Sequence, residues 1–371
     1  MAGPLTGIRV VELASLAPAP FGCMILADLG AEVVQVLRAP KPGAITPPPG
    51  PLDRGRQRIA LDINDAGDLA RLMELVRHAD VFVEGFRPGV AEARGVGPSA
   101  LHAVNPGLIY ARMTGWGQHG PLSSRAGHDI NYIALAGALE AIGREGERPY
   151  PPLNLLGDFA GGSMFLVAGV LAALFERTTS GRGQVIDAAM VDGASLLMSF
   201  VQGLRDAGLW SGKRGTNTLD GGAYYYDTYE CSDGGFVAVG CVEAQFRTAF
   251  LSGLGLEDPG LDFPGVADRA TWNAFRNVVA DRILTRTRDE WAATFEGSDA
   301  CVTPVLAASE APLHPHHVAR NAFVNVDGED QPAPAPRFSR SVAEHPAPPN
   351  DVDVEHILDR WSASALEEVA G

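Results

Sequence analysis

Short β-branched runs alternate with helical patterns through the first half of the chain, and this alternation constrains the fold more than any other feature. The helical pattern that follows the first run begins near Pro18 and Pro20, where proline suits a first turn, and stops at Gly30. Strands that alternate with helices build a largely parallel sheet, so we predict a Rossmann-like α/β domain. The predicted strands are Ile8–Leu13, Glu32–Val36, Arg58–Ile63, Val81–Glu84 and Leu108–Met113.

The alternation stops near residue 190, and this change divides the chain into predicted domains. Tyr226–Glu230 and Phe236–Gly240 flank Asp233-Gly234-Gly235, which is a hairpin signal and predicts an antiparallel element. A short acidic helix is expected near 354–361. We therefore predict a large α/β domain at 1–189, a linker at 190–225, a smaller α+β domain at 226–315, and a C-terminal return to the large domain at 316–371.

The charge balance limits the partners that this chain can have. A net charge of −16 disfavours nucleic acid and an anionic membrane surface as the main partner. Only Lys41 and Lys213 are lysines among the 29 basic residues, so an anionic ligand must be held mainly by arginine, helix N-termini or backbone N–H groups. The apolar run Met164–Phe175 is too short to span a bilayer. With scattered cysteines and no signal-peptide pattern, we expect a cytoplasmic protein with reduced thiols.

Two titratable residues stand out because each lies at the start of a predicted helix. His128 occurs in Ala126-Gly127-His128-Asp129-Ile130-Asn131-Tyr132, and Asp158 in Asn154-Leu155-Leu156-Gly157-Asp158-Phe159-Ala160-Gly161-Gly162. Asp158 could be an ordinary N-cap. However, Gly161 and Gly162 each cost about 1 kcal/mol in a first helical turn relative to alanine. Glycine there suggests that a ligand approaches the helix N-terminus, where backbone N–H groups could stabilise an oxyanion.

Further motifs extend these two segments into a pattern that spans nearly the whole chain. They are Val10-Val11-Glu12-Leu13, Leu26-Ala27-Asp28-Leu29-Gly30-Ala31, Ile109-Tyr110-Ala111-Arg112-Met113-Thr114-Gly115, Gly183-Gln184-Val185-Ile186-Asp187-Ala188, Asp227-Thr228-Tyr229-Glu230 and Asp299-Ala300-Cys301-Val302-Thr303-Pro304-Val305-Leu306. With these motifs in register, the sequence resembles the α-methylacyl-CoA racemases of the family III CoA-transferase superfamily.

The resemblance implies a fold, a reaction and three catalytic residues. Members form an interlocked homodimer in which the large domain of one subunit and the small domain of the other build the active site. The implied reaction is epimerisation at C2 of 2-methylacyl-CoA thioesters, a step of lipid metabolism. His128 and Asp158 would act as acid and base on opposite sides of C2, and Glu243 would support the histidine. The reaction needs no metal and no cofactor, because CoA is part of the acyl-CoA substrate.

The resemblance also assigns residues to the CoA moiety and to the acyl chain. Where family members often carry a basic residue, this chain has Ala93, with Arg94 next to it. Methionine adapts to irregular apolar ligands, although it also packs ordinary cores. The predicted contacts are Arg38, Leu61, Asp62, Ile63 and Arg94 for the nucleotide, Gly127, Asp129, Ile130, Asn131 and Tyr132 for the pantetheine arm, and Met113 and Met190 for the acyl chain.

Two other functions stay open at the level of sequence. A family III CoA-transferase would use Asp158 as a nucleophile and form a covalent adduct, whereas a racemase forms none. A catalytically silent member would bind acyl-CoA without exchanging the C2 hydrogen. The string Gly127-His128-Asp129-Ile130-Asn131-Tyr132 is the racemase form, which favours epimerisation. The acyl group is not specified: branched fatty acyl, sterol side-chain and arylpropionyl thioesters all fit.

Overall fold

A computed structural model describes residues 3–38, 50–257 and 269–370. The chain divides into two compact units, each built from separate stretches of sequence. The first unit comprises Met1–Ala136, Leu153–Leu197 and Pro315–Gly371, and the second comprises Gly137–Pro152 and Met198–His314. The segment predicted as a linker, 190–225, contains two helices, α8 (Met190–Leu197) and α9 (Ser199–Asp206).

The first unit is organised around a seven-stranded sheet in which every neighbouring pair is parallel. This confirms the predicted Rossmann-like sheet. The strand predicted at Arg58–Ile63 is displaced toward the N-terminus. Two strands were not predicted, β6 and β12. In sheet order the strands are β12 (Asn350–Asp351), β3 (Arg56–Ala60), β2 (Glu32–Leu37), β1 (Arg9–Leu13), β4 (Val81–Glu84), β5 (Ile109–Thr114) and β6 (Val185–Ala189).

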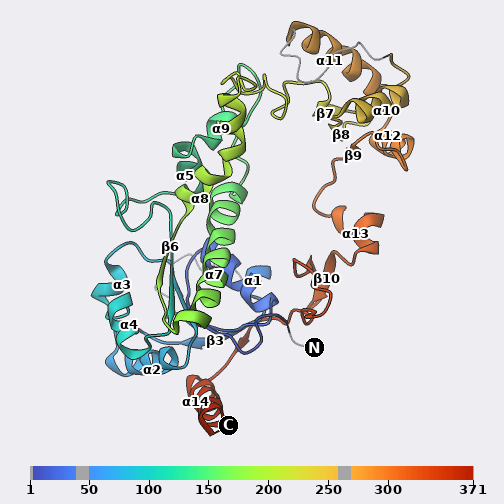
Figure 1. The fold of residues 1–371 in the computed structure, drawn as a ribbon. Coiled ribbons are helices and arrows are strands. Elements are labelled where there is room, and N and C mark those ends of the chain that lie inside the picture. The colour runs from blue at the N-terminus through green and yellow to red at the C-terminus, as the bar shows by residue number, and fades with distance from the viewer. Residues whose placement is uncertain (1–2, 39–49, 258–268, 371) are drawn as a thin grey trace. The chain divides into compact units, whose positions relative to one another are not determined.

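Helices cover both faces of this sheet (Figure 1). On β1, Val10 faces one hydrophobic cluster and Val11 faces the other, as the two-residue period of a strand requires. The Val10 side is covered by α1 (Pro18–Asp28) and α7 (Met164–Ser180). The Val11 side is covered by α2 (Ala66–Arg77), α3 (Val90–Ala93), α4 (Pro98–Val104) and α14 (Val354–Ala370).

A nine-residue π-helix, η2 (Leu155–Ser163), leads directly into α7. Asp158 lies inside η2 and Asn154 is its N-cap, so the alternative that Asp158 is an ordinary N-cap is excluded. Among the described residues one continuous helical run, Leu155–Ser180, is long and apolar enough in composition to cross a membrane. Core helices have the same character, and Leu166 and Val170 of this run are fully buried against the sheet.

The remaining elements of the first unit are short and surround the sheet. The helix α5 carries the predicted catalytic histidine at its start, and β10 and β11 form an antiparallel hairpin near the C-terminus. Their bounds are η1 (Pro51–Asp53), α5 (Asp129–Leu135), α13 (Pro315–Ala319), β10 (Phe323–Val326) and β11 (Glu329–Pro332).

The second unit contains a three-stranded antiparallel sheet and its own hydrophobic cluster. The predicted hairpin is confirmed, since β7 pairs with β8 in a register that places Tyr226 opposite Gly240. Trp291 and Tyr225 are completely or almost completely buried in the cluster beside the sheet. The elements are α6 (Ala138–Ala141), β7 (Tyr226–Glu230), β8 (Phe236–Gly240), α10 (Ala244–Leu254), α11 (Arg269–Ile283), α12 (Arg288–Phe295), β9 (Val302–Pro304) and η3 (Ala311–Leu313).

Candidate active site

A cavity of about 650 Å³ opens at the carboxyl ends of the central strands of the first unit. Strands β1 and β4 are neighbours in the sheet, and the order of strands reverses between them. Parallel α/β sheets bind ligands at such a switch point. Ser15 follows β1, Gly85 follows β4 and Thr114 ends β5, and all three line the cavity. The fold therefore creates a ligand site at this edge of the sheet.

His128 reaches this cavity from the N-cap position of α5. Its own backbone N–H donates to Oδ1 of Asn131, at 3.1 Å. The Tyr132 hydroxyl donates to the carbonyl oxygen of Gly127, at 2.5 Å, which fixes the loop immediately before the histidine. A Cβ atom on Gly115 would overlap the Tyr132 ring, so this close approach requires glycine. The predicted string around His128 thus holds an exposed imidazole over the cavity.

Asp158 reaches the same cavity from η2, and its side chain is half-buried. Burial raises the pKa of its carboxyl group above the ordinary value, and the nearby Asp129 carboxylate raises it further. Asn154, whose Nδ2 donates to Oδ2 of Asp158 at 3.1 Å, and His128 both lower this pKa. A carboxyl group held in this way is suited to exchange a proton with a ligand.

Asp129 lies behind the wall of the cavity and not on its surface, unlike the prediction for the pantetheine arm. Its side chain is 4% exposed, and Oδ2 accepts the backbone N–H groups of Gly157 at 2.6 Å and Asp158 at 2.7 Å. These two N–H groups are therefore occupied and are not available to a ligand oxygen. Ile130 and Asn131, predicted beside Asp129, also lie outside the cavity lining.

The glycines of η2 serve the packing of helices, which corrects the expectation that they admit a ligand. A Cβ atom on Gly161 would lie 2.7 Å from the backbone nitrogen of Ala194 in α8. A Cβ atom on Gly162 would lie 2.8 Å from Cγ of Met190. Met190 in turn lines the cavity together with Met113. The glycines thus allow α8 to approach η2 closely enough to place Met190 beside Asp158.

A second, smaller cavity of about 100 Å³ lies next to the first, and the two share Ala14 and Phe86. The guanidinium carbon of Arg94 lies 5.0 Å from the centre of the Phe86 ring. Hydrogen bonds from Asn64 lower the pKa of Asp62, and the charges of Arg38 and Arg94 lower it slightly further. This cavity brings together all five residues predicted for the nucleotide: Arg38, Leu61, Asp62, Ile63 and Arg94.

Two further cations of the site were not predicted from the sequence. Arg87 and Arg125 both line the larger cavity. Arg87 follows the predicted strand Val81–Glu84, and the residue after the carboxyl end of a parallel strand is a signal that could have identified it. The two cavities therefore hold four arginines in a chain of net charge −16, an arrangement that suits a ligand with several negative charges.

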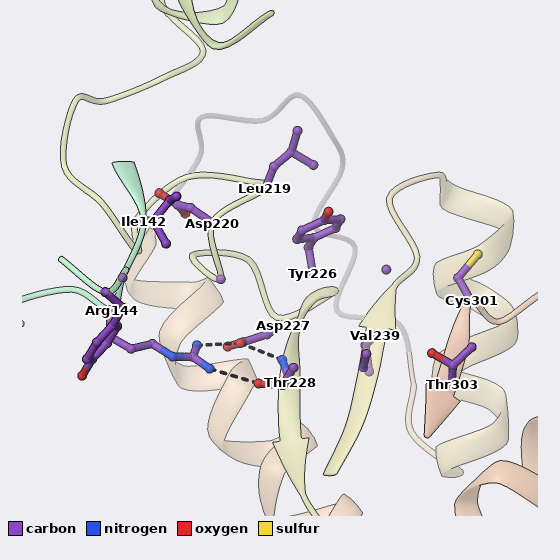
Figure 2. A pocket seen from close by; sticks show the side chains of 15 residues that line it. Ile142, Arg144, Leu219, Asp220, Tyr226, Asp227, Thr228, Val239, Cys301 and Thr303 are labelled. Carbon is purple, nitrogen blue, oxygen red and sulfur yellow. Dashed lines mark hydrogen bonds and ion pairs between the residues drawn. The ribbon is translucent and has the colours of Figure 1, made fainter. Parts of the chain in front are cut away.

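Glu243 belongs to the second unit, where it is the exposed N-cap of α10. A separate cavity of about 590 Å³ lies in this unit and is lined by the sheet residues Tyr226, Val239 and Gly240 (Figure 2). At one side of it, Arg144 pairs with Asp227 at 2.5 Å (Figure 2). Gly240 precedes Glu243 by three residues, so the predicted glutamate follows directly from a strand that lines this cavity.

Comparisons with known proteins agree with this arrangement. Residues 5–352 match the family described as CoA-transferase family III. The chain is 49% identical over 358 residues to the α-methylacyl-CoA racemase of Mus musculus, covering 96% of this chain and 92% of the mouse protein. It is 46% identical over 333 residues to the α-methylacyl-CoA racemase of Homo sapiens, covering 90% and 86%. The crystal structure of a CAIB/BAIF family protein from Brucella suis has the same fold, with a TM-score of 0.77, 24% identity, and coverage of 93% and 95%. This chain belongs to the CoA-transferase family III.

Proposed function

We propose that this chain epimerises C2 of 2-methylacyl-CoA thioesters by proton transfer through an enolate. The observation that carries the proposal is that His128 and Asp158 line one cavity from two different helices. Two groups that can each accept or donate a proton are what inversion at carbon requires. The identity to two racemases over most of the chain supports the same reaction.

The mechanism follows from the weak acidity of the hydrogen on C2. One base removes this proton while the electron pair of the broken C–H bond moves into the thioester to form an enolate. The other group, already protonated, then donates a proton to the opposite face of C2. In one direction neutral His128 is the base and the Asp158 carboxylic acid is the donor. In the other direction the Asp158 carboxylate is the base and the imidazolium is the donor.

The enolate oxygen needs hydrogen-bond donors, because loss of one such donor raises a barrier by about 3 kcal/mol. The N–H groups of Gly157 and Asp158 already bind Asp129. These two N–H groups are therefore not the donors to the enolate oxygen. The enolate oxygen takes its hydrogen bonds from other donors that line the cavity.

The CoA moiety would occupy the smaller cavity and the adjoining part of the larger one. Arg38 and Arg94 would hold the nucleotide end, while Arg87 lies nearer the proton-transfer groups. The chemistry of the residues requires no metal ion and no redox cofactor, because the proton moves between side chains and carbon.

The proposal includes a cytoplasmic homodimer with two active sites. The first unit exposes large apolar side chains, among them Leu153 and Phe175, which are 76% and 79% exposed. A second copy of the chain would cover such side chains. In that dimer, Glu243 of the partner subunit would orient His128 and stabilise the imidazolium, as a carboxylate does in a catalytic triad.

The test of this function is exchange of the C2 hydrogen followed by NMR. Pure (R)- and (S)-2-methylacyl-CoA are incubated separately with the protein in D₂O, with no acceptor acid present. We expect deuterium at C2 while the two epimers converge. If the thioester binds but retains its C2 hydrogen, the racemase function is wrong, and the alternative is CoA transfer with Asp158 as nucleophile. A covalent adduct on Asp158 would then be sought by mass spectrometry of the protein incubated with acyl-CoA.

Single variants test the two proton-transfer roles. His128→Ala and Asp158→Ala should each lower epimerisation by about 10³-fold, the contribution typical of a positioned acid or base. Binding of the CoA thioester should be largely retained, because the arginines are unchanged. The His128→Ala protein should still exchange the C2 hydrogen of the epimer on which Asp158 acts, and only that one. Turnover at the original rate in either variant would refute the two-base mechanism.

A further inference from the structure

The side chain of Asp129 connects the two helices that carry the proposed catalytic pair. It stands at the first position of α5, directly after His128. Its Oδ2 accepts the backbone N–H groups of Gly157 at 2.6 Å and of Asp158 at 2.7 Å, from a segment 28 and 29 residues further along the chain. A single carboxylate oxygen thus holds the start of α5 against η2 at the point where each helix presents its catalytic residue.

The surroundings of Asp129 leave this contact little freedom. The residue is 4% exposed, so water does not compete for the two hydrogen bonds. A Cβ atom on Gly157 would lie 2.6 Å from the same Oδ2 atom, which means that glycine is needed for the carboxylate to come this close. A π-helix leaves its first N–H groups without partners inside the helix, and Asp129 binds two of them.

We infer that Asp129 is a positioning residue that fixes the separation of His128 and Asp158 across the cavity. The inference rests on the proposed two-base function and assigns Asp129 no contact with the substrate. Proton transfer is sensitive to this separation, since a misplacement of about 1 Å can cost about 10²-fold in rate. Because the Asp129 carboxylate joins α5 to η2 where each helix carries its catalytic residue, it determines the positions of His128 and Asp158.

The charge of Asp129 adds a consequence that an ordinary helix cap would not have. Burial and then the Asp129 carboxylate raise the pKa of Asp158, while Asn154 and His128 lower it. Two other carboxylates lie on helices that pack against η2. Asp192 of α8 is exposed, and Oδ1 of Asp28 in α1 accepts a hydrogen bond from Nε of Arg54 at 3.0 Å. Tyr132 of α5 also faces Asp158, and the cations that line the cavity are Arg87 and Arg125. Removal of the Asp129 charge therefore lowers the pKa of Asp158.

The variant Asp129→Asn tests both consequences because it keeps the shape of the side chain and removes its charge. We expect kcat to fall by about 10²-fold with KM within about two-fold of the original value, since the substrate contacts are unchanged. The acid limb of the pH profile of kcat/KM should move to lower pH in both directions of epimerisation. The sign follows because the working pair of His128 and Asp158 holds one proton in either direction, and the acid limb is the binding of a second proton. A lower pKa of Asp158 moves that binding to lower pH.

Asp65→Asn is the matched control. Asp65 is the N-cap of α2, and its Oδ1 also accepts two backbone N–H groups, those of Gly67 at 2.9 Å and Asp68 at 3.0 Å. The same substitution there should leave kcat and the pH profile unchanged. Gly157→Ala disrupts the contact between Asp129 and η2 from the η2 side. It should reproduce the loss of kcat because its Cβ atom displaces the Asp129 carboxylate.

The outcomes separate this inference from the proposed function. If the original protein does not epimerise the thioester, the proposed function fails. If it does, and Asp129→Asn retains kcat or loses it without moving the acid limb, Asp129 is not a positioning residue of this kind. Should Asp129→Asn fail to fold, as judged by circular dichroism, Gly157→Ala decides: an unchanged kcat in that variant would overturn the inference.

Discussion

Arg94 is the residue at which this chain departs most clearly from the pattern that it resembles, since Ala93 stands where a basic residue is usual. The guanidinium group of Arg94 lies over the Phe86 ring in the smaller cavity. We predict that Arg94→Ala raises KM for the acyl-CoA thioester by about 10-fold, because one charge-assisted hydrogen bond to a phosphate is lost. The value of kcat should not change, because Arg94 is far along the ligand from C2.

Steady-state kinetics with a single thioester measures this effect. Arg71→Ala is the control, since Arg71 pairs with Glu355 on the protein surface at 2.8 Å and lines neither cavity. An unchanged KM in Arg94→Ala would mean that Arg94 does not replace the missing basic residue.

At the scale of single residues, the sequence predicted the candidate catalytic side chains but not the contacts that position them. His128 and Asp158 were predicted from their contexts, and the structure places both at one cavity. The position of Asp129 was not predictable in the same way, because its partners Gly157 and Asp158 are far along the chain. A sequence places Asp129 beside His128, but only the packing of two helices turns its carboxylate away from the cavity.

At the scale of elements, the crossing of α8 and η2 offers a sharp test of the packing. A Cβ atom on Gly193 would overlap the carbonyl oxygen of Gly161, and both groups in that contact are rigid backbone. We predict that Gly193→Ala destabilises the protein by about 3 kcal/mol, as overpacking of a close contact does. Thermal unfolding followed by circular dichroism should therefore show a lower Tm.

Gly203→Ala provides the matched control for this substitution. Gly203 lies in α9, and no atom lies within 4 Å of the Cβ that the variant adds. Alanine should be neutral or should stabilise that helix by up to about 1 kcal/mol. Equal Tm values for Gly193→Ala and the original protein would show that η2 and α8 do not approach each other as closely as described.

The success of the strand predictions depended on how each strand is buried. β1 and β4 are almost wholly buried, and each contains a run of β-branched or aromatic residues, Val10-Val11 and Val81-Phe82-Val83, so their bounds were predicted to within one residue. β6 was missed because half of its length is exposed and Asp187 interrupts it. The two-residue strand β12 has no pattern of its own. The π-helical geometry of η2 was also not predicted from the sequence, because its wider turn depends on α8 packing against its glycines.

At the scale of the whole molecule, contacts between distant segments determine which residues belong to each unit. Residues 137–152 fall in the second unit, although the sequence analysis placed them within the large domain. Arg144 pairs with Asp227, and the Nε atom of Arg214 donates to the carbonyl oxygen of Glu147 at 2.9 Å. Such contacts join segments more than 60 residues apart in the sequence, so a local sequence pattern does not predict them.

The proposed dimer predicts that two inactive variants can restore each other. His128→Ala and Glu243→Ala should each be inactive alone. In a co-expressed mixed dimer, one site would combine an intact histidine from one subunit with an intact glutamate from the other. With one intact site of two, the purified mixed dimer should regain about half of the original activity. Each subunit carries a different affinity tag, so that the mixed dimer can be purified and its epimerase activity measured.

Three results would contradict this arrangement. A mixed dimer without activity would mean that His128 and Glu243 of the same subunit serve one site, and full activity of Glu243→Ala alone would mean that Glu243 has no role. A monomeric mass by light scattering for the active protein would exclude the dimer itself.

The π-helix has a consequence for how genes of this kind can change length. An α-helix advances 100° per residue, so the loss of one codon after Asp158 and before α7 would let the segment relax to α geometry. Everything upstream of the loss, including Asp158, would then turn by about 100° away from the cavity. The number of residues in η2 is therefore constrained by the phase of the helix, as well as by the kinds of side chain that the segment carries.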